Sequence, residues 1–165
     1  PCLKSIVTDF DANMPWYRWS VTFPVEHIQN SLMEHGYNIG DLQNINILRK
    51  SQGGAVTICR FIGSDSAVQI ENEYTIRTIL SPLGLNIIRQ DGSVVTDFQM
   101  LPSAYFSVEK ILEKESLTGF LFQGGGYGHG VGLSQNGANE MAKRGYSCFD
   151  ILNYYYEGFE LKNYV

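Results

Sequence analysis

The chain has 165 residues, of which 44% are hydrophobic and 18% are charged, enough apolar content for one globular domain with a buried core. The net charge is −5 and the 12 lysines and arginines are scattered, so nucleic acid is not an expected partner. No apolar run approaches the ~20 residues of a membrane-spanning helix. The three cysteines form no C-x-x-C pair, which argues against a zinc ribbon or a thioredoxin-type site, and Cys59 lies in an apolar run that predicts a core position.

The first half of the chain predicts alternating strands and short helices. Residues 16–23 are rich in aromatic and β-branched side chains, which favours a strand. A helix is predicted to begin at Pro24 and to end at Gly36, and a second short helix is predicted over residues 73–80. Between them lie three predicted strands joined by short turns that contain glycine, as in an antiparallel meander. These strands are residues 45–49, 55–62 and 67–70.

The second half begins with weaker signals. Residues 86–97 are expected to form a surface excursion that turns at Asp91-Gly92. Two late strands are predicted over residues 101–108 and 119–122, and the second leads directly into a glycine-rich segment. The predicted fold class is therefore α+β: an antiparallel β-meander with several short helices, and a glycine-rich loop leading into a C-terminal helical pair.

Glycine is concentrated between Gly124 and Gly137, where seven of the 17 glycines of the chain fall. Such a run is tolerated where the backbone needs a positive φ or where another group approaches the main chain closely. Ser134 is well placed as the N-cap of a short helix over residues 135–144. An S-x-x-D signal at residues 147–150 predicts the start of a second helix.

The glycine-rich loop is a candidate binding surface. His129 lies between Gly128 and Gly130, so its sequence neighbours are not expected to cover the imidazole. Backbone N–H groups ahead of a helix N-terminus attract anions or oxygen-rich ligands. The glycine spacing fits neither G-x-G-x-x-G nor a G-K-[ST] phosphate loop, so a nucleotide site is not predicted. The alternative is a structural crossover in which His129 bonds a backbone carbonyl.

A dense pattern runs from residue 126 to residue 158: G-Y-G-H-G-V-G-L-S-Q-N-G-A, then M-A, G, I-L, Y-Y and G at fixed spacings. It resembles the signature G-x-G-H-G-V-G-[ML]-S-Q-x-G-A-x-x-M-A-x-x-G, followed by I-L-x-x-Y-Y-x-G, of the stage II sporulation protein D family, also called the amidase enhancer family. Shorter matches extend the resemblance over essentially the whole chain, as the C-terminal part of the family domain. They lie at residues 3–5, 19–23, 50–56, 76–77, 83–84 and 101–106.

The resemblance implies an extracytoplasmic protein of the cell envelope that acts on bacterial peptidoglycan. In this family the sporulation protein resembles a lytic transglycosylase that cuts peptide-free glycan strands, and its relatives modulate cell-wall amidases. The family's catalytic glutamate, and the zinc-binding stretch of some members, lie upstream of the matched part. We therefore assign no catalytic residue, metal ligand or cofactor within this chain. Residues 1–165 are expected to form a single domain that an upstream segment or a second chain completes.

The resemblance also implies a glycan groove along the glycine-rich loop. Tyr127, His129, Ser134 and Gln135 are the residues expected to line it, and Tyr155 is a candidate for stacking on a sugar ring. Tyr155 has an alternative place in the core, since three consecutive tyrosines on a helix cannot all point the same way.

Two functions are open on this basis. The chain is either part of a glycan-cleaving enzyme that is inactive on its own, or a non-catalytic wall-binding module that modulates a cell-wall amidase. Glycan cleavage needs a carboxyl group that protonates the leaving oxygen. The glutamates near the motifs are expected to be solvated charges instead of that acid. They are Glu71, Glu73, Glu140 and Glu157.

Overall fold

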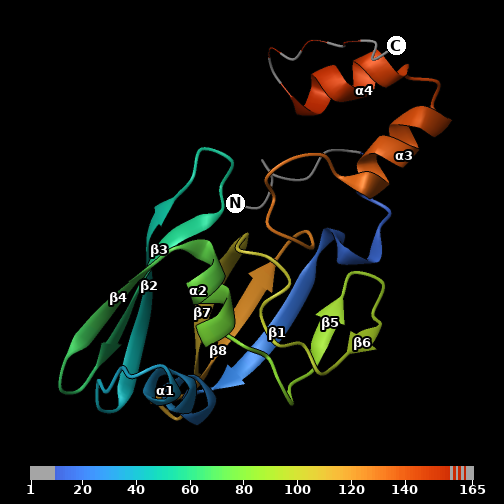
Figure 1. Cartoon of the computed structure of the whole chain (residues 1–165). Helices are drawn as coiled ribbons and strands as arrows, with labels where there is room; N and C mark the ends of the chain where they lie inside the picture. The colour runs from blue at the N-terminus through green and yellow to red at the C-terminus, as the bar shows by residue number, and fades with distance from the viewer. Residues whose placement is uncertain (1–9, 157, 159, 161, 163–165) are drawn as a thin grey trace.

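The computed structural model describes residues 10–156, 158, 160 and 162. Within these residues, eight strands form two antiparallel sheets that four α-helices accompany, which confirms the α+β class (Figure 1). The larger sheet has the order β6-β5-β1-β8-β7, and the smaller sheet is the predicted meander β2-β3-β4. The elements are β1 (Trp19–Pro24), α1 (Val25–Glu34), β2 (Leu42–Lys50), β3 (Val56–Gly63), β4 (Ala67–Glu71), α2 (Glu73–Ile79), β5 (Ile87–Arg89), β6 (Val94–Val95), β7 (Phe106–Glu113), β8 (Ser116–Gly124), α3 (Gln135–Lys143) and α4 (Cys148–Tyr155).

The larger sheet has one buried face, and β1 shows why. Trp19, Val21 and Phe23 are buried, while the residues between them face the other way, because alternate side chains of a strand point to opposite faces. The strand predicted over residues 119–122 is the centre of β8, which pairs with β1. The rings of Phe23 and Phe122 meet edge to face with centroids 5.1 Å apart. The core of this sheet is therefore largely aromatic.

The first two helices connect the sheets. α1 contacts β1 and β8 of the larger sheet and β2 of the smaller sheet, and its Ile28 and Leu32 are fully buried. α2 packs on β3 and β4, and the Ser31 hydroxyl of α1 donates to the Ile79 carbonyl of α2 at 2.6 Å. Both sheets thereby share one hydrophobic core. None of the described helices is long and apolar enough to cross a membrane.

Most of residues 86–97 are exposed, as expected for a surface excursion, but the segment also forms two short strands that the sequence does not predict. β5 pairs with β1 on one side and with β6 on the other, and Ile87 is fully buried. The predicted turn at Asp91-Gly92 is present: Gly92 has a φ of 79°, and its N–H donates to the Arg89 carbonyl at 2.9 Å. Strands of two or three residues are too short to give a readable alternation, which explains why they are not predicted.

The strand expected over residues 101–108 begins only at Phe106. Proline at position 102 has no N–H to offer a ladder. The segment before β7 is held by backbone bonds at Leu101 and Ala104 and by a side chain of α2. Arg77 of α2, only 7% exposed, donates from Nε to the Leu101 carbonyl at 2.9 Å and from Nη2 to the Pro102 carbonyl at 3.2 Å. This buried arginine therefore fixes the segment that, as described below, supports the glycine-rich loop.

Cys59 occupies the core, as its apolar sequence context predicts. It lies in β3 and is fully buried. Burial raises the pKa of its thiol to about 12, so the side chain packs as a small neutral group. Cys148 is exposed at the start of α4, and Cys2 lies outside the described residues.

Candidate functional site

The glycine-rich loop, residues 124–133, leaves the end of β8 and leads to α3 (Figure 1). Its first half is tied to two other parts of the chain. The Gly125 N–H donates to the Tyr105 carbonyl at 3.0 Å, and the Gly126 N–H donates to the Trp16 carbonyl at 2.8 Å. The Trp19 indole N–H donates to the Gly126 carbonyl at 3.1 Å. These bonds fix the exit of the loop from the sheet.

The segment that Arg77 holds supports the same loop. The buried Ser103 hydroxyl donates to the Gly125 carbonyl at 2.7 Å. The Gly128 N–H donates to the Pro102 carbonyl, which also accepts from Arg77, at 2.9 Å. A continuous chain of hydrogen bonds therefore runs from α2 to the glycine-rich loop.

The structure explains the clustering of glycine. Gly130 has a φ of 71°, and a Cβ there would overlap the Tyr105 ring and hydroxyl. At Gly124 a larger residue is excluded for a purely steric reason, because a Cβ would overlap the indole of buried Trp19. Both reasons predicted for the run, a left-handed backbone and a close approach, are present.

The C-terminal helical pair forms as its start signals predict. The Ser134 hydroxyl accepts from the Gly137 N–H at 3.1 Å and caps α3, and it donates to the Asp11 carboxylate at 3.1 Å. Ser147 and Asp150 form the reciprocal capping box at the start of α4. The hydrogen bonds from Ser147 lower the pKa of the Asp150 carboxyl. This second helix ends at Tyr155.

A cavity of about 470 Å³ lies along the glycine-rich loop. All the residues predicted to line a groove do line this cavity, although their positions in the sequence span two helices and a loop. They are Tyr127, His129, Ser134, Gln135 and Tyr155. The fold thus brings these five side chains together along one cavity.

His129 is exposed, as the flanking glycines predict, but its bonding differs from the structural alternative. Its Nδ1 accepts from the Val131 N–H at 2.9 Å, so the ring meets a backbone N–H and not a carbonyl. In the neutral ring the hydrogen must then sit on Nε2. The imidazole therefore presents an N–H donor on an exposed side chain in the cavity wall.

Tyr155 lies between the two alternatives that the sequence leaves open. Its side chain is partly buried, and its hydroxyl is covered without a hydrogen bond in the described part of the chain. The hydroxyl lies against Gly137, where a Cβ would overlap it. Burial raises the pKa of Tyr155, and the nearby Asp11 carboxylate adds to this, so the phenol stays neutral. Its stacking on a sugar ring remains a prediction.

Comparisons with known proteins show the family of the chain. Residues 84–132, which end inside the glycine-rich loop, match the family described as "Domain of unknown function (DUF8618)". Over 163 residues, 98% of this chain, the sequence is 30% identical to stage II sporulation protein D of Bacillus subtilis (strain 168). The chain belongs to the stage II sporulation protein D and amidase enhancer family.

Two further relatives carry one or the other of the two family names. Stage II sporulation protein D of Bacillus amyloliquefaciens is 28% identical over 167 residues, again 98% of this chain. The amidase enhancer of Bacillus subtilis (strain 168) is 37% identical over 65 residues, which are 39% of this chain and 9% of that protein. The chain spans 38% of the length of both sporulation proteins.

No described glutamate lines the cavity. Glu140 pairs with Arg144 at 3.1 Å, and Glu73 pairs with Arg77 at 3.5 Å. Glu71 accepts from Gln69, and Glu157 lies outside the described residues. Among the described residues, no three His, Cys, Asp or Glu side chains are grouped as metal ligands.

The other wall of the cavity is not predictable from the local sequence. It is built from the segment before β1, which supplies Asp11, Trp16 and Tyr17, together with Ser103 and Tyr105. Trp16 was assigned to the first strand, but it lies in a 3-10 turn at Pro15–Tyr17, ahead of β1. The aromatic character of the segment was visible in the sequence, whereas nothing local indicated its place beside the glycine-rich loop.

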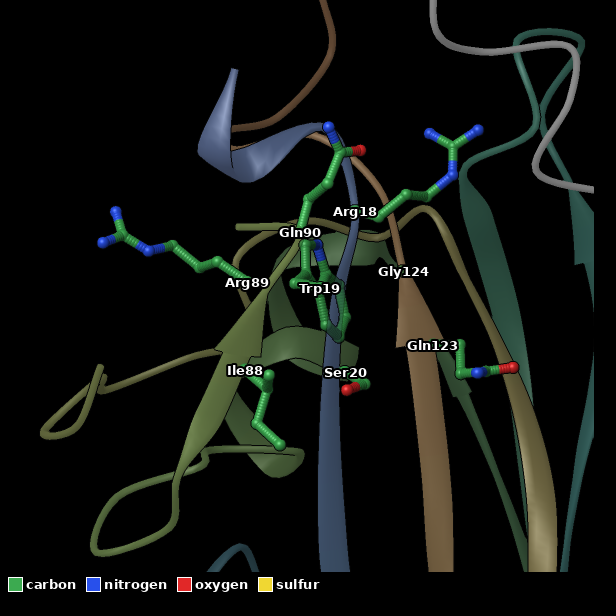
Figure 2. Close-up of a pocket in the computed structure, with 8 residues that line it drawn as sticks. All are labelled: Arg18, Trp19, Ser20, Ile88, Arg89, Gln90, Gln123 and Gly124. Carbon is green, nitrogen blue, oxygen red and sulfur yellow. The ribbon is translucent and has the colours of Figure 1, made fainter. Parts of the chain in front are cut away.

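A second, smaller cavity of about 290 Å³ lies beside the start of β1 and the end of β8. Figure 2 shows Arg18 and Arg89 at its two sides, with their guanidinium groups directed away from each other. The two cations do not converge on one point, and none of the residues predicted to line a groove lies here. We therefore place the candidate site in the larger cavity.

Proposed function

We propose that the cavity along the glycine-rich loop binds the glycan strands of bacterial cell-wall peptidoglycan, at the cell envelope. The observation that carries the proposal is that the five residues named from the family pattern line one cavity. Its volume, about 470 Å³, is in the usual range for ligand sites. Relatives named for sporulation and for amidase enhancement support a role at the cell wall.

The cavity suits the uncharged parts of a sugar chain, which are its hydroxyl groups and ring faces. No lysine or arginine is among the described residues that line it, so we expect the lactyl carboxylates of a peptide-free strand to stay outside the cavity. Tyr127 offers an aromatic face, and the His129 Nε2–H offers a donor to a sugar oxygen. Aromatic and aliphatic walls with a few polar groups are typical of small-ligand sites.

The proposal is for binding without cleavage by the described residues alone. Cleavage of a glycosidic bond needs a carboxyl group that donates a proton to the leaving oxygen. Asp11 is the one described carboxylate that lines the cavity, and it accepts the hydrogen of Ser134 at 3.1 Å. Glycan strands are therefore expected to keep their length when they are incubated with this chain.

A second candidate function is a module that acts with a cell-wall amidase. The 37% identity to the amidase enhancer over 65 residues favours it. Glycan binding and amidase modulation are compatible, because a bound module can bring an enzyme to the same polymer. Amidase activity on intact cell walls, measured with and without this chain, tests the second candidate separately.

Substitution of His129 by alanine is expected to weaken binding of peptide-free glycan strands about three- to tenfold, the loss of one hydrogen bond. Co-sedimentation of the protein with insoluble strands measures the affinity. His35→Ala is the matched control, because His35 is an exposed histidine at the C-terminal end of α1. Among the described residues its ring bonds only the Ser31 carbonyl. Equal affinities for wild type and His129→Ala would remove His129 from the site, and no binding by wild type would overturn the proposal.

A further inference from the structure

Three aromatic rings from distant parts of the chain meet at the rim of the cavity. Trp16 lies ahead of β1, Phe98 lies between β6 and β7, and Tyr127 lies in the glycine-rich loop. Tyr127 stacks on Trp16 with centroids 5.1 Å apart and an interplanar angle of 30°. Phe98 contacts both rings, at 5.3 Å from Trp16 and 6.1 Å from Tyr127. We call these three residues the aromatic platform.

The platform leaves its outermost ring in solvent. Tyr127 is 65% exposed, whereas Trp16 and Phe98 are partly buried beneath it. The glycines on both sides of Tyr127 carry no side chain that would cover its ring. In a core cluster all members lose their contact with water. The aromatic platform differs, because the Tyr127 ring has two aromatic contacts and is still exposed. Such an arrangement is typical of a surface that binds a ligand.

The surroundings of the platform indicate the chemistry of that ligand. Trp16 and Tyr127 both line the cavity, which is also lined by the hydroxyl-bearing Tyr105 and Ser134 and by the carboxylate-bearing Asp11. An apolar face beside hydroxyl and carboxylate groups matches a pyranose ring, which has C–H faces and a rim of hydroxyls. A hydrophobic peptide side chain would instead require a deep apolar pocket.

We propose that the aromatic platform is a sugar-stacking subsite, in which one uncharged pyranose ring lies on the face of Tyr127 while the neighbouring ring enters the cavity. Trp16 is a positioning residue: it supports Tyr127 from behind and holds its ring at a fixed tilt. The inference rests on the proposed function and deepens it. It adds a residue from the segment before β1 and states which end of the cavity holds the apolar face of the sugar.

The test is a titration of the full chain with a soluble β-1,4-linked N-acetylglucosamine tetrasaccharide, followed by calorimetry. Tyr127→Ala is expected to bind five- to tenfold more weakly, and Trp16→Ala several-fold more weakly. Trp16→Phe keeps an aromatic support and is expected to stay within about twofold of wild type. Tyr74→Ala is the control, because Tyr74 is a tyrosine of α2 that is 58% exposed and does not line the cavity.

Tryptophan fluorescence gives a second readout that a purely structural role would not change. Trp19 is buried, so the ligand-induced fluorescence change is expected to come from Trp16 and to vanish in Trp16→Phe, although that variant still binds. If wild type binds the tetrasaccharide but Tyr127→Ala and Trp16→Ala bind equally well, the platform is not a subsite and the proposed function stands. If wild type binds neither the tetrasaccharide nor peptide-free strands, both proposals are overturned.

Discussion

Replacing Arg77 by methionine is expected to lower the free energy of unfolding by about 2–4 kcal/mol, because two buried carbonyls lose a charged donor. Arg77 is 7% exposed and bonds the carbonyls of Leu101 and Pro102. Methionine keeps much of the length of the side chain but has no N–H group. Urea unfolding, monitored by circular dichroism, measures the loss.

A second arginine provides the control. Arg144 also pairs with a glutamate four residues earlier, but its side chain is 43% exposed and bonds no buried carbonyl in the described structure. Arg144→Met is expected to cost only about 0.3–0.5 kcal/mol. Losses of similar size in the two variants would contradict the role of Arg77 in holding the segment under the glycine-rich loop.

Replacing Gly124 by alanine is expected to destabilise the protein by about 3 kcal/mol, since the added methyl group would overlap the ring of buried Trp19. Gly124 is the last residue of β8 and pairs with both β1 and β7, so neither backbone nor ring can move away easily. Thermal and urea unfolding of the variant measure the effect.

The control lies two residues further along the same loop. Gly126 has a φ of 78°, but a Cβ there would meet no other atom within 4 Å. Gly126→Ala therefore tests left-handed strain alone, at about 1 kcal/mol. A double-mutant cycle of Gly124→Ala with Trp19→Phe should show a combined loss smaller than the sum, because the smaller ring makes room. Strict additivity would contradict the steric explanation.

The helix boundaries near the site were predictable because their signals are local. Ser134 caps α3 through a bond to the N–H three residues later, and Ser147 does the same for α4. The glycines were equally readable, since a run of them has few structural uses. The fold class followed from the same kind of local evidence, in which strand and helix signals alternate without a repeated β-α-β unit.

The rest of the site depended on contacts that no short window contains. The Ser134 hydroxyl and the Asp11 carboxylate are 123 positions apart in the sequence, and the Trp19 indole reaches Gly126 over 107 positions. Position along the chain gave no sign that Asp11, Met14, Trp16 and Tyr17 line the same cavity as the loop. Similarly, β5 and β6 are too short to show a period, and only pairing with β1 defines them.

The central claim is that the glycine-rich loop and the segment before β1 form one saccharide site. Amide and indole chemical shifts of the labelled protein, titrated with peptide-free glycan oligosaccharides, test it most directly. Shifts are expected for the amides of residues 124–133 and for the Trp16 indole N–H, and the amides of β2, β3 and β4 are expected to stay unmoved. Shifts confined to the smaller sheet, or no shifts with saturating oligosaccharide, would contradict it.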